Sequence, residues 1–191
     1  PVYYWCDVPA NQKENVFIVR GSHTKGTPKV KYRGIFINDE APGLTSWVYP
    51  KFGDFNAEFY EHVFELLLRM KGNYLWPAMW SPRKFYADDP ANGELANELG
   101  IVMGTSHHEP LARAHAEWKP PFAKGPWNYS ENKDELEEFW KGGMERAKDW
   151  ESLITVGMRG DGDEAMSEET ATDLLEIIVK AQRGIIEEVT G

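Results

Sequence analysis

Four short stretches of the sequence carry side chains that could perform chemistry, and each stretch directly follows an apolar run. The candidates are acids, histidines, an arginine, a tryptophan and an asparagine: Asn38, Asp39, Glu40, Trp80, His107, His108, Glu109, Arg159, Asp161 and Asp163. Carboxylates around one cleft suit glycoside hydrolysis, in which one carboxylic acid protonates the leaving oxygen and a second carboxylate activates water or attacks directly. Crowded or buried acids can keep one carboxyl protonated near neutral pH. An arginine would be useful if the sugar carried its own carboxylate, because a guanidinium binds carboxylate through two hydrogen bonds.

The stretch 157–166, GMRGDGDEAM, allows three interpretations: a metal-binding loop, a tight structural turn, or the rim of an active site. It begins like a calcium loop at Asp161. However, Ala165, Met166 and Thr172 stand where such a loop needs a ligand, a glycine and a glutamate. The glycines instead permit a sharp turn that would lift the short acids into a cleft. The alternative is a turn that only caps a helix beginning at Ser167.

The other candidates also have plain structural interpretations. Asp39 and Glu40 could cap the loop that follows them, and Trp80 could belong to the core. His107 and His108 would point to opposite sides of a continuing strand, so we expect at most one of them to face the site. The sequence has no HExxH motif, no second well-spaced histidine pair and no cysteine cluster, which disfavours a zinc site. We therefore predict neither a metal nor another cofactor.

An alternation of strand-like and helix-like segments must position these residues. Apolar runs typical of strands occupy 32–40, 73–80, 100–109 and 152–163. Helical patterns occupy 56–72, 90–100 and 109–118, and two more begin near Asn132 and Ser167. A segment rich in Pro, Gly and aromatic residues, KPPFAKGPWNYS at 119–130, lies between the pattern at 109–118 and the one that begins near Asn132. The expected helix boundaries are a C-terminal cap at Gly72, a capping pair of Asn132 with Glu135, and an N-terminal cap at Ser167.

The alternation predicts an α/β fold made of parallel β/α units. The sequence has no glycine-rich dinucleotide fingerprint and no phosphate loop. Four such units fit the first half of a TIM-type (β/α)8 barrel, which needs about 250 residues, and we favour this over an open sheet. Residues 1–31 are expected to be the end of a preceding β-rich region and linker, and residues 32–191 the four barrel units. In such barrels the chemistry gathers at the C-terminal ends of the strands, where all the candidates lie.

Composition excludes several classes of partner. The net charge is −10 with no basic run, which disfavours nucleic acid and anionic membranes. No stretch approaches the roughly 20 apolar residues of a membrane span. The lone Cys6 cannot form an internal disulfide, and no signal-peptide pattern is visible. The eight tryptophans are expected to serve mainly in packing, although indoles also stack well on sugars.

Four of these stretches closely resemble a known family. They are similar to the first half of the catalytic barrel of glycoside hydrolase family 115, the xylan alpha-1,2-glucuronidases. The stretches are KYRGIFINDE, FELLLRMKGNYLWPAMW, GIVMGTSHHEP and GMRGDGD. The four motifs occur in the family's order and extend over nearly the whole chain. The resemblance implies an inverting hydrolase without a cofactor, which removes alpha-1,2-linked glucuronic acid, or its 4-O-methyl form, from xylan side chains. It also implies further domains, a possible homodimer of the full-length protein, and additional site residues on the remaining barrel strands.

The resemblance assigns roles to the candidates. Acid/base catalysis is expected from three of them: Asp39, Glu109 and Asp161. Substrate binding is expected from the others: Asn38, Glu40, Trp80, His107, His108, Arg159 and Asp163. Arg159, with help from His107, is expected to bind the uronate carboxylate of glucuronoxylan or an aldouronic acid. Secretion or a periplasmic location is expected from this substrate.

Two alternatives remain open at this stage. The half-barrel could be catalytically silent and serve as a sugar-binding or structural fragment. It could also be a metal-dependent barrel hydrolase that uses the HHE and DGD residues.

Overall fold

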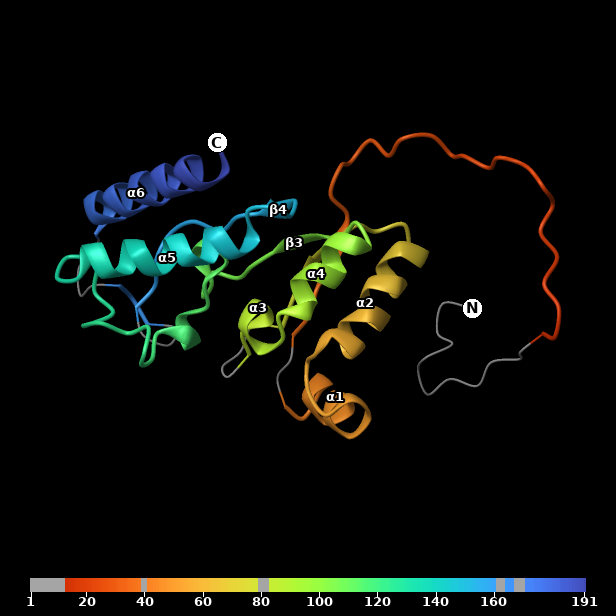
Figure 1. Ribbon diagram of the computed structural model, residues 1–191, viewed down its shortest axis with the longest axis horizontal. Helices are drawn as coiled ribbons and strands as arrows, with labels where there is room; N and C mark the ends of the chain where they lie inside the picture. Colours follow the sequence, from red (N-terminus) through yellow and green to blue (C-terminus); the bar gives the residue numbers. More distant parts are fainter. Residues whose placement is uncertain (1–12, 39–40, 79–82, 161–163, 167–170) are drawn as a thin grey trace.

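Four parallel strands form a single sheet in the computed structural model of the protein, which describes residues 13–38, 41–78, 83–160, 164–166 and 171–191. The strands are β1 (Gly34–Phe36), β2 (Tyr74–Trp76), β3 (Val102–Gly104) and β4 (Ser152–Leu153), and each pairs with the next along the chain. Helical segments separate successive strands (Figure 1). The predicted α/β fold is therefore confirmed. Its sequential strand order is consistent with part of a (β/α)8 barrel.

The helices match the predicted pattern in four places and differ from it in three. The six α-helices are α1 (Leu44–Phe52), α2 (Ala57–Arg69), α3 (Phe85–Asp88), α4 (Ala91–Glu98), α5 (Lys133–Ala147) and α6 (Thr172–Thr190). The sequence analysis missed α1, which contains Pro50, and the single turn α3. The helix predicted at 109–118 was wrong. Two 3-10 turns occupy this segment instead: η1 (Pro110–Ala112) and η2 (His115–Glu117).

The helix ends differ in detail from the predicted caps. Asn132 does precede α5, but its side chain makes no capping bond and donates instead to the carbonyls of Lys124 and Pro126. The left-handed residue after α2 is Lys71, with φ 62°, rather than Gly72. The predicted cap at Ser167 lies outside the described residues. Local pattern thus located the helices better than it identified their terminal contacts.

The two faces of the sheet have different surroundings. Leu75 pairs with Met103, and both are buried in one cluster with Phe64 of α2 and Ala96 of α4. Side chains alternate between faces, so the next residues along each strand lie on the opposite side. There Phe36 packs on Trp76, and Val102 is only 4% exposed. Ile35 and Phe36 of β1 are each 44% exposed although they lie on opposite faces, so exposure follows the position of β1 at the sheet edge.

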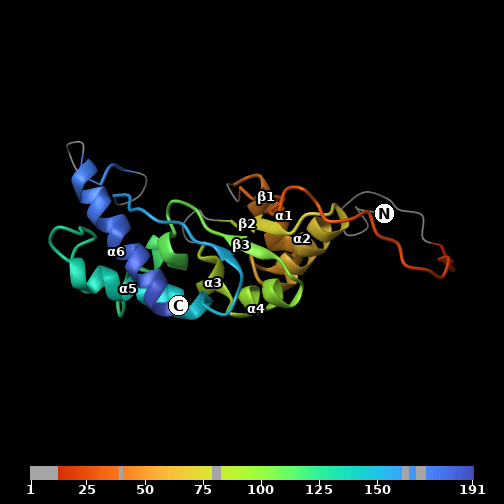
Figure 2. The same cartoon turned by 90° about the horizontal axis from the view of Figure 1, so that it is seen from above.

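A second apolar cluster lies around α5 and α6. It includes Leu136 and Trp140 of α5, Ile178 of α6, and Leu111 of η1. Figure 2 shows α5 and α6 together at one end of the molecule, with α1 and α2 toward the other end. The amphipathic faces predicted for these helices are therefore buried against each other and against the loop that follows β3.

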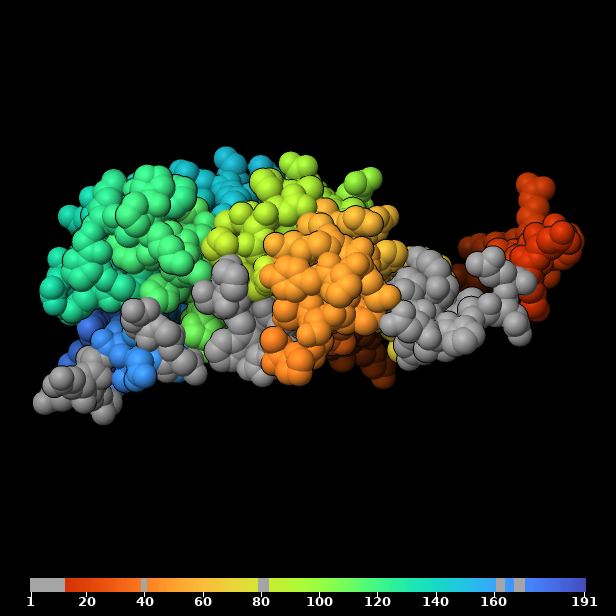
Figure 3. Space-filling view, turned by 90° about the horizontal axis from the view of Figure 1, so that it is seen from below, coloured from red at the N-terminus to blue at the C-terminus, as the bar shows by residue number. Residues whose placement is uncertain are grey.

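Residues 13–33 form no helix or strand, although a β-rich region was predicted within 1–31. The red part of this segment stands apart from the packed body in Figure 3, and Phe17 is 93% exposed. Its end is joined to the body, because the hydroxyl of Tyr32 donates to Glu151 and the amide of Arg33 donates to Asn73. The assignment of residues 1–31 to a preceding region stays a prediction. Among the helices of the described chain, none is long and apolar enough to cross a membrane.

Gly143 lets α5 approach η1 closely. A Cβ atom built at this position would lie 2.3 Å from the carbonyl oxygen of Leu111 and 2.9 Å from Cβ of Arg113. Real side chains do not tolerate such distances, so any larger residue must push the η1 loop away from the helix. The adjacent Gly142 has no atom within 4 Å of its virtual Cβ and supplies a matched control.

We expect Gly143→Ala to lower the free energy of unfolding by about 1–3 kcal/mol, because the added methyl overpacks the contact with Leu111. Gly142→Ala should raise it by about 0.5–1 kcal/mol, because alanine loses less backbone entropy in a helix. Denaturant unfolding of both variants checks this. Equal effects at the two positions would contradict the close approach.

Candidate functional site

The loop after β3 is fastened to the end of β4 by backbone and hydroxyl hydrogen bonds. The amide of Leu111 donates to the carbonyl of Thr155 at 3.0 Å. The hydroxyl of Thr155 donates to the carbonyl of Thr105, and that of Thr105 donates to the carbonyl of Glu109, both at 2.7 Å. These bonds satisfy polar groups that a regular helix would have satisfied internally. The loop carrying the HHE residues is thereby held beside the loop carrying Arg159.

A buried ion cluster holds the same loop against α5. The carboxylate of Glu117 lies 3.2 Å from a guanidinium nitrogen of Arg113 and 3.1 Å from one of Arg146. It also accepts a hydrogen bond from the amide of Ala114 at 2.9 Å. Arg146 donates in addition to the carbonyl of Ala112 at 2.5 Å. The cluster thus ties η1 and η2 to the C-terminal end of α5.

Left-handed backbone occurs at two residues inside this fastened loop. Leu111 has φ 53° and Ala112 has φ 57°, although neither is glycine. Such conformations cost about 1–3 kcal/mol each and persist where the surrounding structure enforces them. The ion cluster and the contact with Gly143 are the enforcing contacts here.

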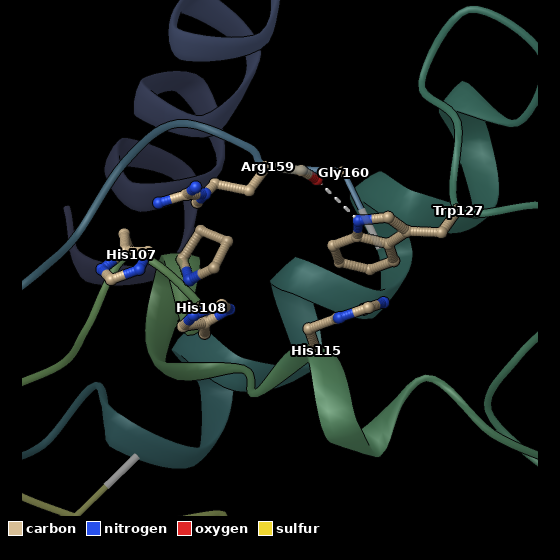
Figure 4. A pocket seen from close by; sticks show the side chains of 7 residues that line it. His107, His108, His115, Trp127, Arg159 and Gly160 are labelled. Atoms are coloured by element: carbon tan, nitrogen blue, oxygen red, sulfur yellow. Dashed lines mark hydrogen bonds between the residues drawn. The ribbon is translucent and has the colours of Figure 1, made fainter. Parts of the chain in front are cut away.

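A small depression lies between the loops that follow β3 and β4, and it is too narrow to hold a water molecule as the side chains stand. Its lining residues are His107, His108, Pro110, His115, Trp127, Arg159 and Gly160. Arg159 extends toward the histidine pair on one side, and Trp127 lies over His115 on the other (Figure 4). Imidazole and guanidinium groups are hydrogen-bond donors, so this surface is suited to an anionic ligand.

The expectation that at most one of the two adjacent histidines faces the site was wrong. His107 and His108 both line the depression, with ring centroids 4.2 Å apart. The strand ends at Gly104, so the alternation of side chains does not continue to these residues.

The Arg159 loop is fixed from two directions. The Nε1–H of Trp127 donates to the carbonyl of Arg159 at 2.8 Å, and the amide of Gly160 donates to the carbonyl of Glu164 at 3.1 Å. A Cβ at Gly160 would meet the carbonyl oxygen of Ala165 at 2.3 Å, so this tight turn requires glycine. Gly160 and Glu164 are thus held together, whereas residues 161–163, at the centre of the turn predicted for RGDGD, lie outside the described residues.

The start of the same loop is clamped by α6. Gln182 is fully buried, and its amide accepts from the N–H of Gly157 at 2.6 Å and donates to the carbonyl of Gly157 at 2.8 Å. Gly157 has φ 117°, a conformation that favours glycine. One buried side chain thus satisfies both backbone groups where the chain leaves β4.

The structure brings three predicted site residues together: His107, His108 and Arg159. Asn38 is exposed two residues after β1 and is not among the described residues that line the depression. Five further predicted residues lie outside the described part of the chain: Asp39, Glu40, Trp80, Asp161 and Asp163. Their roles stay predictions.

Glu109, the remaining candidate acid, is only 3% exposed and is not one of the described lining residues. Burial raises the pKa of Tyr86 to about 12, and the charge of Glu109 acts in the same direction. The carboxylate of Glu109 therefore lies near Tyr86. The guanidinium carbon of Arg146 lies over the ring of Tyr86, 5.3 Å from its centroid. A catalytic role for Glu109 stays a prediction.

Two lining residues, His115 and Trp127, were missed by the sequence analysis. His115 was placed inside a predicted helix, where nothing distinguished it. Trp127 lies in the 119–130 segment, and a tryptophan in a Pro/Gly-rich loop beside a predicted site was the available signal.

The described residues contain no group of three His, Cys, Asp or Glu side chains placed to hold a metal ion.

Comparison with known proteins decides the family. The model of glycosyl hydrolase family 115 matches residues 25–191. The chain belongs to glycosyl hydrolase family 115. The family predicted from the strand-end motifs is thus confirmed. No curated protein matches the chain.

A solved structure gives the same result. The chain is similar to BtGH115A, described as a 4-O-methyl-alpha-glucuronidase with specificity for decorated arabinogalactans, with 36% sequence identity and a TM-score of 0.76. The similarity covers 86% of this chain and 23% of BtGH115A. This family 115 chain therefore spans about a quarter of that protein's length.

We expect Gln182→Ala to lower the free energy of unfolding by about 1–3 kcal/mol, because the N–H and carbonyl of Gly157 lose their buried partner. Lys180→Ala, on an exposed side chain of the same helix paired only with Glu176, should change it by less than about 0.5 kcal/mol. Denaturant unfolding measures both. A Gln182 variant as stable as the Lys180 variant would contradict the clamp.

Proposed function

We propose that this chain forms the first half of the catalytic barrel of an alpha-glucuronidase, which removes glucuronic acid or its 4-O-methyl form from a plant polysaccharide. Membership of family 115 and similarity to a 4-O-methyl-alpha-glucuronidase support the proposal. BtGH115A acts on decorated arabinogalactans, whereas the resemblance of the motifs favours glucuronoxylan. Both polymers are therefore substrates to test, and both favour a protein exported from the cell.

The observation that carries the proposal is the clustering of Arg159, His107 and His108 on one depression at the C-terminal ends of β3 and β4. A glucuronic acid unit differs from a neutral hexose by one carboxylate. We propose that Arg159 binds this carboxylate through two charge-assisted hydrogen bonds, with His107 donating a further one.

The reaction we propose is hydrolysis with inversion. A carboxylic acid gives its proton to the glycosidic oxygen while a carboxylate removes a proton from water. The water oxygen then bonds to the anomeric carbon as the bond to the leaving oxygen breaks. Inversion needs the two carboxyl groups to lie about 6.5–9.5 Å apart. Our first candidate for one of these two carboxyl groups is Asp161, which directly follows the lining residue Gly160. The second candidate is Asp39.

The Arg159 assignment predicts a charge-selective defect in the complete natural protein. Arg159→Ala should lower kcat/KM on an aldouronic acid by about 10- to 150-fold, the equivalent of about 1.5–3 kcal/mol for hydrogen bonds to a charged group. The same variant should be much less impaired on the carboxamide of that substrate, which carries no charge. Arg159→Lys, which keeps a charged donor group, should have a kcat/KM on the aldouronic acid between those of the parent protein and Arg159→Ala.

Arg69→Ala is the control, because Arg69 is a surface residue of α2 paired with Glu65. It should leave both substrates unaffected. Equal losses on the acid and the carboxamide in Arg159→Ala would show that Arg159 does not bind the uronate carboxylate.

A further inference from the structure

We propose that Trp127 is a positioning residue for Arg159, because its indole N–H fixes the peptide group that sets the direction of the arginine side chain. The inference rests on the proposed function, in which Arg159 binds the uronate carboxylate. Trp127 belongs to the loop between η2 and α5, and its side chain donates to the backbone of Arg159.

The peptide group between Arg159 and Gly160 has both of its polar atoms bonded. Its carbonyl oxygen accepts from Nε1 of Trp127 at 2.8 Å, and its N–H donates to the carbonyl of Glu164 at 3.1 Å. Figure 4 shows the first bond crossing from the indole to the Arg159 backbone at the rim of the depression. A peptide plane held at both ends cannot rotate without breaking a bond. The Cα of Arg159 is therefore fixed at the edge of the depression.

Trp127 is itself held rigidly. Its ring contacts Phe139 and Trp140 of α5 edge-on, with centroids at 6.1 and 6.5 Å, and Trp118 at 5.7 Å. On its other side lies the ring of His115, at 4.4 Å. Because the indole packs against α5 and also donates to the Arg159 carbonyl, it fixes the Arg159 peptide relative to α5.

The loop that carries Trp127 is also pinned. The side-chain amide of Asn132, just before α5, donates to the carbonyls of Lys124 and Pro126 at 2.9 and 3.0 Å. This explains why Asn132 does not cap its own helix. Its side chain stabilises the approach of the 119–130 segment to the site instead.

The positioning matters because two-point binding of a carboxylate depends strongly on geometry. An arginine side chain has many rotamers, and a site is selective only when its supporting contacts restrict them. Loss of the indole N–H would free the peptide plane and spread the guanidinium over several positions. Binding of a carboxylate should weaken, whereas binding of an uncharged sugar should change little.

The test uses the complete natural protein with two variants at Trp127. Trp127→Phe keeps an aromatic ring and removes the donor. Replacement of Trp127 by 3-benzothienylalanine keeps the bicyclic shape and replaces only the N–H by sulfur. Titration calorimetry gives the dissociation constants of D-glucuronate and D-glucuronamide for each protein.

We expect both variants to bind D-glucuronate about 5- to 10-fold more weakly, the loss typical of one hydrogen bond, and to bind D-glucuronamide within about twofold of the parent. Trp150→Phe is the control, because Trp150 stacks on Tyr86 with centroids 5.9 Å apart in the other apolar cluster and is not among the described rings that contact Trp127. It should leave the ratio of the two dissociation constants unchanged.

An unchanged ratio in the benzothienylalanine protein overturns the inference, even if Trp127→Phe fails to fold. An equal change in Trp150→Phe also overturns it, because the effect would then come from general loosening of the apolar core. The same titration on Arg159→Ala separates the two ideas. If that variant keeps the parent ratio, the proposed function of Arg159 fails; if it loses discrimination while the Trp127 variants keep it, only the positioning role fails.

Discussion

The buried carboxylate of Glu117 is the contact on which the geometry of the site depends. It pairs with both Arg113 and Arg146 and accepts a hydrogen bond from a backbone amide, in a region where an unpaired charge would be very costly. The segment after β3 forms no long helix and contains left-handed residues, so it could not hold its shape from local bonds alone. Removing one partner from such a buried cluster typically costs about 3–5 kcal/mol.

This anchoring lets two distant segments form one surface. The β3 loop supplies His107, His108 and His115, and the β4 loop supplies Arg159 and Gly160. Parallel pairing of β3 with β4 brings their C-terminal ends to the same edge, and the hydrogen bonds between Thr105 and Thr155 extend the contact beyond the strands. In the proposed function, this surface binds the carboxylate that distinguishes a glucuronic acid unit from a neutral hexose. Donors that are already fixed before binding lose less conformational entropy when they bind that group.

The elements that were predicted well share strong periodicity. The amphipathic patterns of α2, α5 and α6 bury their apolar faces in the two clusters, and the apolar runs contain the four strands. The misses have local causes. Pro50 concealed α1, and the composition of 109–118 favours a helix until Gly143 and the ion cluster force left-handed backbone at Leu111 and Ala112. Tertiary contacts worth several kcal/mol outweigh helix propensities of a few tenths per residue.

The sequence by itself determined the parallel β/α alternation, the family, and the strand-end positions of His107, His108 and Arg159. Those features follow from hydrophobic period and from motifs that are contiguous in the chain. Only the tertiary structure decided that both histidines face the depression, that Glu109 lies buried near Tyr86, and that Trp127 and Gln182 hold the Arg159 loop. The contacts of Gln182 and Trp127 join residues 25 and 32 positions apart along the chain. No local pattern encodes such contacts, because packing of α5 and α6 against the strand ends selects them.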